Sequence, residues 1–119
     1  MGSETIRIYI PLEVKRAKVE NFEEVNKFKD TCINFMDSIT SCDVTKYFRE
    51  KDNKVVVLAC ECITLYGRIQ WFKDSIKEEL IKLAIKLNLD HIHVETCDIN
   101  ESITHNDIKC YKYKIEQGE

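Results

Sequence analysis

The segment Lys54–Ile63 (KVVVLACECI) constrains the fold of this 119-residue chain more than any other stretch. It is the longest apolar run in the sequence, it is rich in β-branched residues, and the turn-forming pair Asp52-Asn53 precedes it. Such a run is typical of a strand that is buried on most of both faces and therefore lies centrally in its sheet. We expect the other elements to be layers built on this strand.

Alternation and helical spacing predict the elements around the central strand. Further strands are expected at 5–10, 42–50, 91–97 and 108–115, with a polar loop at 98–107 before the last one. One helix is expected at 21–39, where Asn21 and Glu24 form a capping box, and another at 68–88, where a left-handed Asn88 ends the helix and Leu89 folds back. The order β-α-β-β-α-β-β predicts a single α+β domain over residues 1–119. Its expected form is a ferredoxin-like two-layer sandwich, with an antiparallel sheet and two helices on one face.

The pairing of strand 42–50 with the central strand can be predicted from its apolar residues. A three-residue turn with a left-handed Asn53 places Phe48 opposite Val56, Val44 opposite Cys60, and Cys42 opposite Cys62. This register gives one consistent apolar face, which we expect to face the core. Lys46 opposite Leu58 is its one exception.

Composition and charge exclude several classes of protein. The formal net charge of −3 disfavours a generic grip on nucleic acid, and no run reaches the roughly 18 apolar residues of a membrane span. The first residues carry no apolar segment of the kind that directs secretion, so we expect a cytoplasmic protein, in the host cytoplasm if it is viral. In that compartment the six cysteines are expected to be reduced, and several pack as small hydrophobic residues. No cofactor is predicted.

A candidate binding surface is predicted on the sheet face away from the helices. Five side chains are expected to share it: Arg7, Tyr9, Tyr47, Arg49 and Val57. Arginines and aromatics on an open sheet can stack nucleic-acid bases, but the central strand offers Val and Ala where base-stacking sheets place aromatic residues. The pattern favours a partly apolar face that another protein covers.

A second candidate site lies on the strand at 91–97. His91, His93 and Glu95 share one face of this strand, and two imidazoles with a carboxylate can hold a metal ion. The alternative is an exposed polar face that binds nothing, since alternation itself places hydrophilic residues there. No catalytic residues are predicted, because no nucleophile with a base, no acid-base pair and no glycine-rich phosphate loop can be identified.

The helix at 68–88 has more apolar surface than one sheet needs. Trp71, Ile81 and Ile85 lie beside its main stripe and are candidate interface residues. Together with the open sheet face they predict self-association, most simply a homodimer. Lysines 109, 112 and 114 on the expected last strand would discourage open-ended edge pairing and favour a closed contact.

The C-terminal third resembles a family of small phage anti-CRISPR proteins that inhibit Cas9. The resemblance rests on Lys82-Leu83, Leu87-Asn88-Leu89-Asp90 and Asn106-Asp107-Ile108-Lys109-Cys110-Tyr111, and it includes no catalytic motif. The basic N-terminal arm of that family is absent here, so no site residues are transferred. The resemblance implies a viral, non-enzymatic inhibitor that binds a protein of the host's defence. Two alternatives remain: an oligomeric module that holds a small molecule or nucleotide at a subunit interface, and a small metal-dependent enzyme.

Overall fold

The computed structural model describes residues 4–96 and 100–116. Within these residues, five strands form one sheet in the order β2-β3-β1-β4-β5, and each pair of neighbours is antiparallel. The strands are β1 (Glu4–Pro11), β2 (Ser38–Arg49), β3 (Val55–Gly67), β4 (Ile92–Thr96) and β5 (Asn100–Ile103). β3 is the predicted central strand, and it pairs with β1 on one side and β2 on the other.

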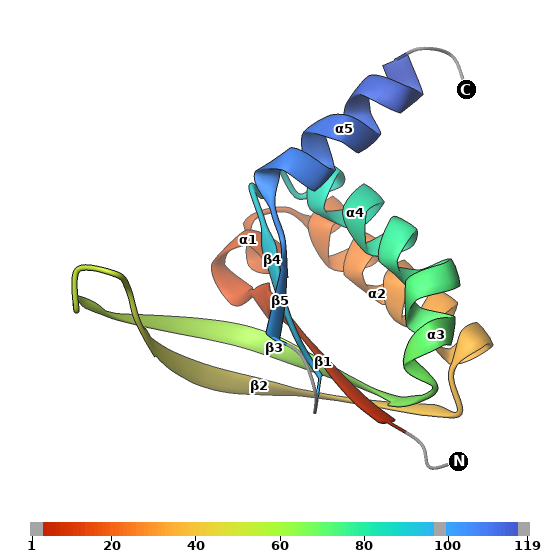
Figure 1. Ribbon diagram of the computed structural model, residues 1–119, viewed down its shortest axis with the longest axis horizontal. Coiled ribbons are helices and arrows are strands. Elements are labelled where there is room, and N and C mark those ends of the chain that lie inside the picture. The colour runs from red at the N-terminus through yellow and green to blue at the C-terminus, as the bar shows by residue number, and fades with distance from the viewer. Residues whose placement is uncertain (1–3, 97–99, 117–119) are drawn as a thin grey trace.

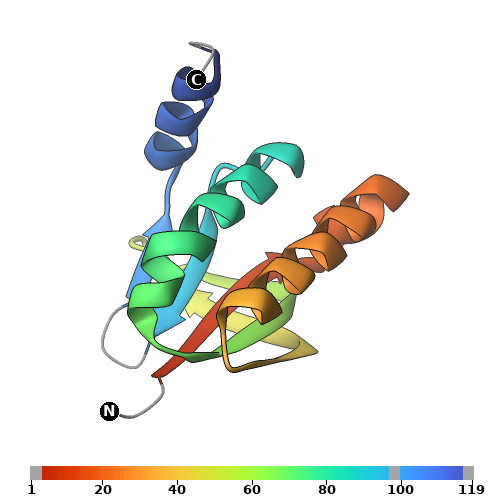
Figure 2. The same ribbon diagram turned by 90° about the vertical axis from the view of Figure 1, so that its right-hand side faces the viewer.

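The helices cover one face of this sheet (Figures 1 and 2). They are α1 (Leu12–Ala17) and α2 (Val19–Phe35) after β1, then α3 (Ile69–Trp71), the π-helical turn η1 (Phe72–Ile76) and α4 (Lys77–Lys86) after β3. Between the layers lies a core to which β1 contributes Ile6, Ile8 and Ile10, all fully buried. The predicted α+β class, with an antiparallel sheet and a helical layer on one face, is confirmed. Among the described residues, no helix is both long and apolar enough to cross a membrane.

The predicted register between β2 and β3 is confirmed. Phe48 lies opposite Val56, Val44 opposite Cys60, and Cys42 opposite Cys62. Asn53 has φ 65°, in the left-handed region that Asn adopts more readily than most residues. Its amide donates to the Glu50 carbonyl at 2.9 Å, which closes the turn. The expected exception is present as well, since Lys46 lies opposite Leu58.

The direction of the two faces was predicted wrongly. Cys62 lies beside Tyr9 of β1 on the open face, and by alternation Lys46, Phe48 and Cys60 share that face. The opposite face of β3 carries Ile63 and Leu65, which face the helices in phase with β1. β3 is apolar on both faces, so its own pattern does not show which side the helices cover. As a consequence Tyr47, Arg49 and Val57 do not share a face with Tyr9. They lie on the other side of the β2–β3 hairpin, which projects from the body in Figure 1.

The first long helix begins earlier than predicted. α1 and α2 are separated at Lys18, whose backbone is extended, and α2 starts at Val19. Asn21 therefore lies inside α2 and does not cap it. Its side-chain amide donates to the Val14 carbonyl at 2.9 Å and so ties α1 to α2. The helix ends at Phe35, and Ile39 belongs to β2.

The end of the second long helix is confirmed. Asn88 has φ 57°, and the amide of Leu89 donates back to the Ala84 carbonyl at 2.9 Å. Two of its three candidate interface residues, however, are used inside the fold. Ile81 is buried in the core and Ile85 packs against it, whereas Trp71 stays partly exposed. The surplus apolar arc of this helix is therefore not a free surface at Ile81 or Ile85.

The predicted last strand is a helix, α5 (His105–Glu116). Ile108 and Tyr111 are one helical turn apart and both pack against the core. Asp107 accepts bonds from the Thr104 amide at 3.0 Å and from its hydroxyl at 3.2 Å, so that the start of the helix is capped. The fifth strand is β5, within the expected loop. Residue 97, the end of the expected strand, and residues 98–99 of that loop lie outside the described residues. The lysines at 109, 112 and 114 consequently lie on α5 and protect no sheet edge.

Leu80 on α4 provides a direct test of the helical layer. Its side chain is fully buried in the core, so Leu80→Ala should lower the free energy of unfolding by about 2–5 kcal/mol. Urea unfolding followed by circular dichroism measures the change. Val19→Ala is the matched control, because Val19 is 76% exposed and its truncation should change stability by less than about 0.5 kcal/mol. Equal losses in the two variants would mean that the packing of α4 is misplaced.

Candidate functional site

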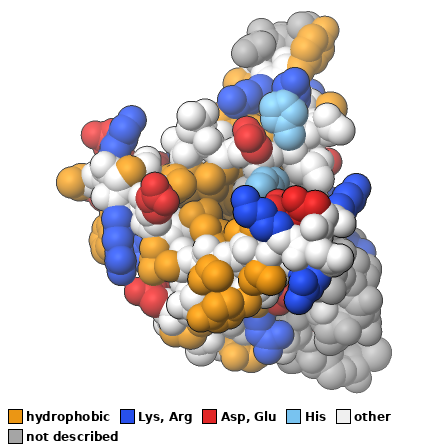
Figure 3. All heavy atoms as spheres, turned by 90° about the vertical axis from the view of Figure 1, so that its left-hand side faces the viewer, with side chains coloured by type: hydrophobic (Ala, Val, Ile, Leu, Met, Phe, Trp, Pro, Cys, Tyr) orange, Lys and Arg blue, Asp and Glu red, His pale blue; other side chains and the backbone are white. Residues whose placement is uncertain are grey.

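A hollow on the open face of the sheet is the candidate site. It has a volume of about 470 Å³ and lies where the β2–β3 hairpin meets β1 and β4. Its lining includes four apolar residues, Pro11, Phe48, Leu58 and Cys60. The seven others carry polar groups: Tyr9, Lys46, Tyr47, His91, His93, Glu95 and Ser102. Figure 3 looks onto this face and shows hydrophobic side chains gathered beside basic, acidic and histidine side chains.

Four polar side chains in the hollow form a connected group, which we call the Glu95 cluster: Tyr9, Lys46, His93 and Glu95. The Tyr9 hydroxyl donates to Oε1 of Glu95 at 2.6 Å, and the Lys46 ammonium donates to Oε2 at 2.8 Å. Nε2 of His93 lies 3.5 Å from the same Oε2. The Lys46 nitrogen also stands 4.1 Å from the centre of the Tyr9 ring, a cation–π distance. The carboxylate is thus held from three sides.

The sheet must coil strongly to bring Lys46 and Glu95 together. β2 and β4 are three strand spacings apart in the sheet order, which is about 14 Å in a flat sheet. A hydrogen bond of 2.8 Å between their side chains requires the β2–β3 hairpin to curl over β1. Long twisted strands curl in this way, and the resulting concave face is the hollow.

The protonation states of the cluster follow from its contacts. Burial alone would raise the pKa of Glu95, but the hydrogen bonds from Lys46 and Tyr9 outweigh it and lower this pKa to about 2. Burial raises the pKa of Tyr9, and the hydrogen bond to the charged Glu95 raises it further. Glu95 is therefore a carboxylate and Tyr9 a neutral phenol at any working pH. The pair can bind and orient a ligand, whereas Tyr9 cannot act as a base.

A second charged group lies on the helix side of the sheet and does not line the hollow. Glu61 of β3 is 2% exposed and accepts bonds from Lys15 of α1 at 2.6 Å, Lys29 of α2 at 2.5 Å and the Ser41 hydroxyl of β2. Burial opposes the charge of Glu61, yet these three donors lower its pKa to about 2. Because it joins two helices to two strands, this group holds the layers together.

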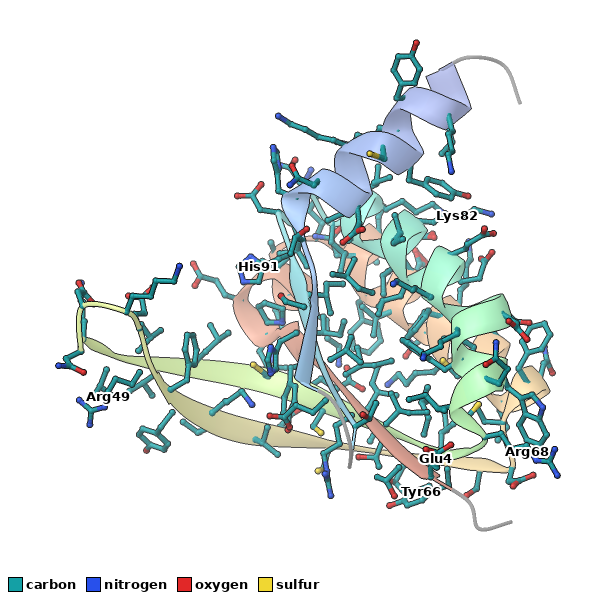
Figure 4. All side chains as sticks on the ribbon, viewed as in Figure 1. Glu4, Arg49, Tyr66, Arg68, Lys82 and His91 are labelled. Atoms are coloured by element: carbon teal, nitrogen blue, oxygen red, sulfur yellow. The ribbon has the colours of Figure 1, made fainter. Side chains whose placement is uncertain are left out.

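The structure unites residues that the sequence analysis had placed in two separate sites. Tyr9 and Tyr47 were predicted on the open sheet face, and His91, His93 and Glu95 were predicted as a ligand or metal group; all five line the hollow. Figure 4 shows His91 beside β4 and Arg49 near the tip of the hairpin, away from it. Val57 likewise lies outside the hollow. Arg7 lies opposite Glu95 on the same face and is exposed, but it does not line the hollow.

Lys46 is the residue of the Glu95 cluster that the sequence analysis missed, and the apolar lining residues such as Phe48 were not predicted as site residues either. Its signal was present, because a lysine interrupts an otherwise apolar alternation opposite Leu58. The predicted metal site has no support in the described part of the chain, where no group of three or more suitable ligands converges. The predicted homodimer stays a prediction, and the exposed apolar residues of the hairpin include Tyr47 (69% exposed) and Val57 (56% exposed).

The fold and the hollow define a small α+β protein with a polar cluster set in a half-apolar site, and comparison with solved structures gives a more particular likeness. The chain is similar to a phage SAM lyase, solved in complex with S-methyl-5'-thioadenosine. The two share 16% sequence identity with a TM-score of 0.55, over 87% of this chain and 90% of that one. No known family description matches the sequence, and no curated protein is significantly similar to it.

This likeness corrects the function inferred from the sequence. The matched structure is an enzyme and not an anti-CRISPR protein, which overturns the expectation of a non-enzymatic inhibitor of host defence. The resemblance of the C-terminal third to anti-CRISPR proteins stays an expectation from the sequence. Part of the segment that carries it, Asn106–Tyr111, lies in helix α5.

Proposed function

We propose that this protein is a small enzyme that binds S-adenosylmethionine in the hollow and cleaves a carbon–sulfur bond of its sulfonium group. The observation that carries the proposal is the Glu95 cluster, an ionised carboxylate with a fixed ammonium partner in a half-apolar hollow. It occurs in a fold shared with an enzyme whose name gives the same substrate.

The apolar and the polar residues of the hollow match the two ends of this substrate. S-adenosylmethionine has an apolar, aromatic adenine at one end and a zwitterionic amino acid at the other, with the positive sulfur between them. The adenine would pack against the apolar residues, among which Phe48 offers a ring for stacking. Lys46 would bind the substrate's carboxylate, and Glu95 would face its ammonium and sulfonium charges.

Cleavage of the carbon–sulfur bond requires little from the protein beyond binding the substrate in this orientation. When an oxygen of the substrate's own carboxylate attacks the amino-acid carbon bound to sulfur, the carbon–sulfur bond breaks and a five-membered lactone forms. The electron pair stays on sulfur, and a neutral thioether leaves without needing a proton. S-methyl-5'-thioadenosine is that thioether. A positive charge disappears from sulfur in this step, so a site that shields sulfur from water favours it. The step therefore needs no nucleophile and no acid-base pair from the protein, and the polar residues lining the hollow would act by binding and orienting the substrate.

The test is incubation of the purified protein with S-adenosylmethionine, followed by chromatography for S-methyl-5'-thioadenosine. We expect the thioether to accumulate with time and with protein concentration. S-adenosylhomocysteine is the matched control, because it has the same two ends but a neutral sulfur, and it should not be cleaved. If S-adenosylmethionine stabilises the protein against heat but is recovered intact, the protein binds it without being an enzyme, and the proposal is wrong.

A further inference from the structure

Two cysteines face each other across the β2–β3 ladder on the open side of the sheet. Cys42 of β2 lies directly opposite Cys62 of β3, and both are free thiols in the structure. Cys42 is exposed, whereas Cys62 is almost fully buried and lies opposite Tyr9 of β1. An exposed thiol thus stands beside a buried one at the floor of the open face.

The geometry of the ladder places these two residues within reach of a disulfide. The Glu50 amide donates to the Lys54 carbonyl, which marks that pair as a hydrogen-bonded one. Along the same uninterrupted ladder, Cys42 and Cys62 lie an even number of residues from Glu50 and Lys54. They are therefore a hydrogen-bonded pair as well. Such pairs have Cα atoms about 5.5 Å apart, within the range of about 4.4–6.8 Å that disulfides require.

The other cysteines of the described residues lack such a partner. Cys60 lies opposite Val44, and Cys32 is fully buried on α2. Burial raises the pKa of Cys60, and it raises the pKa of Cys32 to about 12, which disfavours the thiolate form of both. Cys110 is exposed on α5, a separate element. Among the described cysteines, Cys42 is therefore the exposed one that has a second cysteine directly opposite it, Cys62.

We propose that Cys42 and Cys62 are a redox modification site, at which a disulfide oxidant of the glutathione type closes a bond across the β2–β3 ladder. The thiolate of Cys42 attacks the oxidant and releases one glutathione thiol. The sulfur of Cys62 then attacks the mixed disulfide at Cys42 and releases the second. Two electrons pass from the cysteines to the oxidant, and the two thiol protons end on the two glutathiones. This proposal does not depend on the proposed enzymatic activity.

The disulfide should make the hairpin harder to unfold. It would close a loop from residue 42 to residue 62, which contains all of the hairpin that projects from the body, and so would restrict the unfolded chain. We expect the melting temperature of the oxidised protein to exceed that of the reduced protein by about 5 °C or more. Dithiothreitol should reverse the change.

The experiment uses the full chain with Cys97→Ser and Cys110→Ser, which leaves Cys32, Cys42, Cys60 and Cys62. After treatment with oxidised glutathione, free thiols are alkylated and the protein is digested for peptide mass spectrometry. We expect two thiols to be lost, the intact mass to fall by two hydrogens, and one cross-linked peptide pair to contain Cys42 and Cys62. Adding Cys42→Ser should leave Cys62 free and remove the change in melting temperature.

Three results would overturn the proposal. One is glutathione retained on Cys42 while Cys62 is still alkylated, and another is a cross-link from Cys42 to Cys60. The third is the loss of no thiols under conditions that oxidise a small dithiol standard. The peptide map of the protein with Cys97→Ser and Cys110→Ser distinguishes these outcomes by itself. The proposal can therefore be tested even if the added Cys42→Ser variant does not fold.

Discussion

Glu95→Gln is expected to lower kcat/KM for cleavage of S-adenosylmethionine on the order of 100-fold. The amide keeps the shape of the side chain but removes the negative charge that faces the substrate and balances Lys46. Two unit charges 4 Å apart near a protein surface interact by about 4 kcal/mol. Glu95 is a quarter exposed, which screens part of this interaction and leads us to expect a loss nearer 100-fold than 1000-fold. The initial rate of thioether release measures it.

The matched control for this variant is Glu78→Gln. Glu78 is exposed on α4, in the helical layer on the other side of the sheet. The activity of the Glu78→Gln variant should therefore equal that of the parent protein. Thermal melting of both variants separates lost chemistry from lost folding. An activity of Glu95→Gln within threefold of the parent, in a folded protein, would show that the carboxylate takes no part and that the site lies elsewhere.

The strand register could be predicted because residues close to the turn determine it. The residues on either side of the turn alternate in the same phase, and Asn53 accepts the left-handed conformation that a three-residue turn needs. The direction of the two faces could not be predicted in the same way. Glu61 marks the helix side of β3 with a charge, and it is buried there only because Lys15, Lys29 and Ser41 arrive from three other elements. The usable signal was that Ile63 and Leu65 lie opposite the isoleucines of β1. They therefore point to the same face of the sheet, which the helices cover.

The candidate site was partly predictable for a related reason. Tyr9, His93 and Glu95 were singled out because alternation places polar side chains on one face of β1 and of β4. That the two groups meet, and that Lys46 joins them, depends on the coiling of the sheet, which no local pattern encodes. The helix at 105–116 was missed because Tyr111, Tyr113 and Ile115 alternate with Lys112 and Lys114 at a period of two. The contact that selects the helical period is the packing of Ile108 and Tyr111 against the core.

Glu61→Gln should lower the free energy of unfolding at pH 7 by about 3–5 kcal/mol, the usual cost of leaving buried charges without their partner. Lys15 and Lys29 are only 11% and 22% exposed, so their ammonium groups would face each other with little water to separate them. Asp43→Asn is the matched control, because Asp43 forms a solvent-exposed pair with Arg16 at 3.3 Å. Its loss should cost less than about 1 kcal/mol. Urea unfolding at fixed ionic strength measures both variants.

The pH dependence distinguishes a charge effect from a packing effect. Folding lowers the pKa of Glu61 from 4.5 to about 2, so its contribution to stability is complete above about pH 5 and disappears as the pH falls towards 2. The difference between the parent and Glu61→Gln should therefore be largest at pH 7 and shrink steadily below pH 5. Replacing the whole group, as in Lys15→Met with Lys29→Met and Glu61→Leu, should recover most of the lost stability, because no charge is left unpaired. A deficit that stays constant from pH 7 to pH 3 would mean that the amide disturbs packing and that the charges of this group contribute nothing.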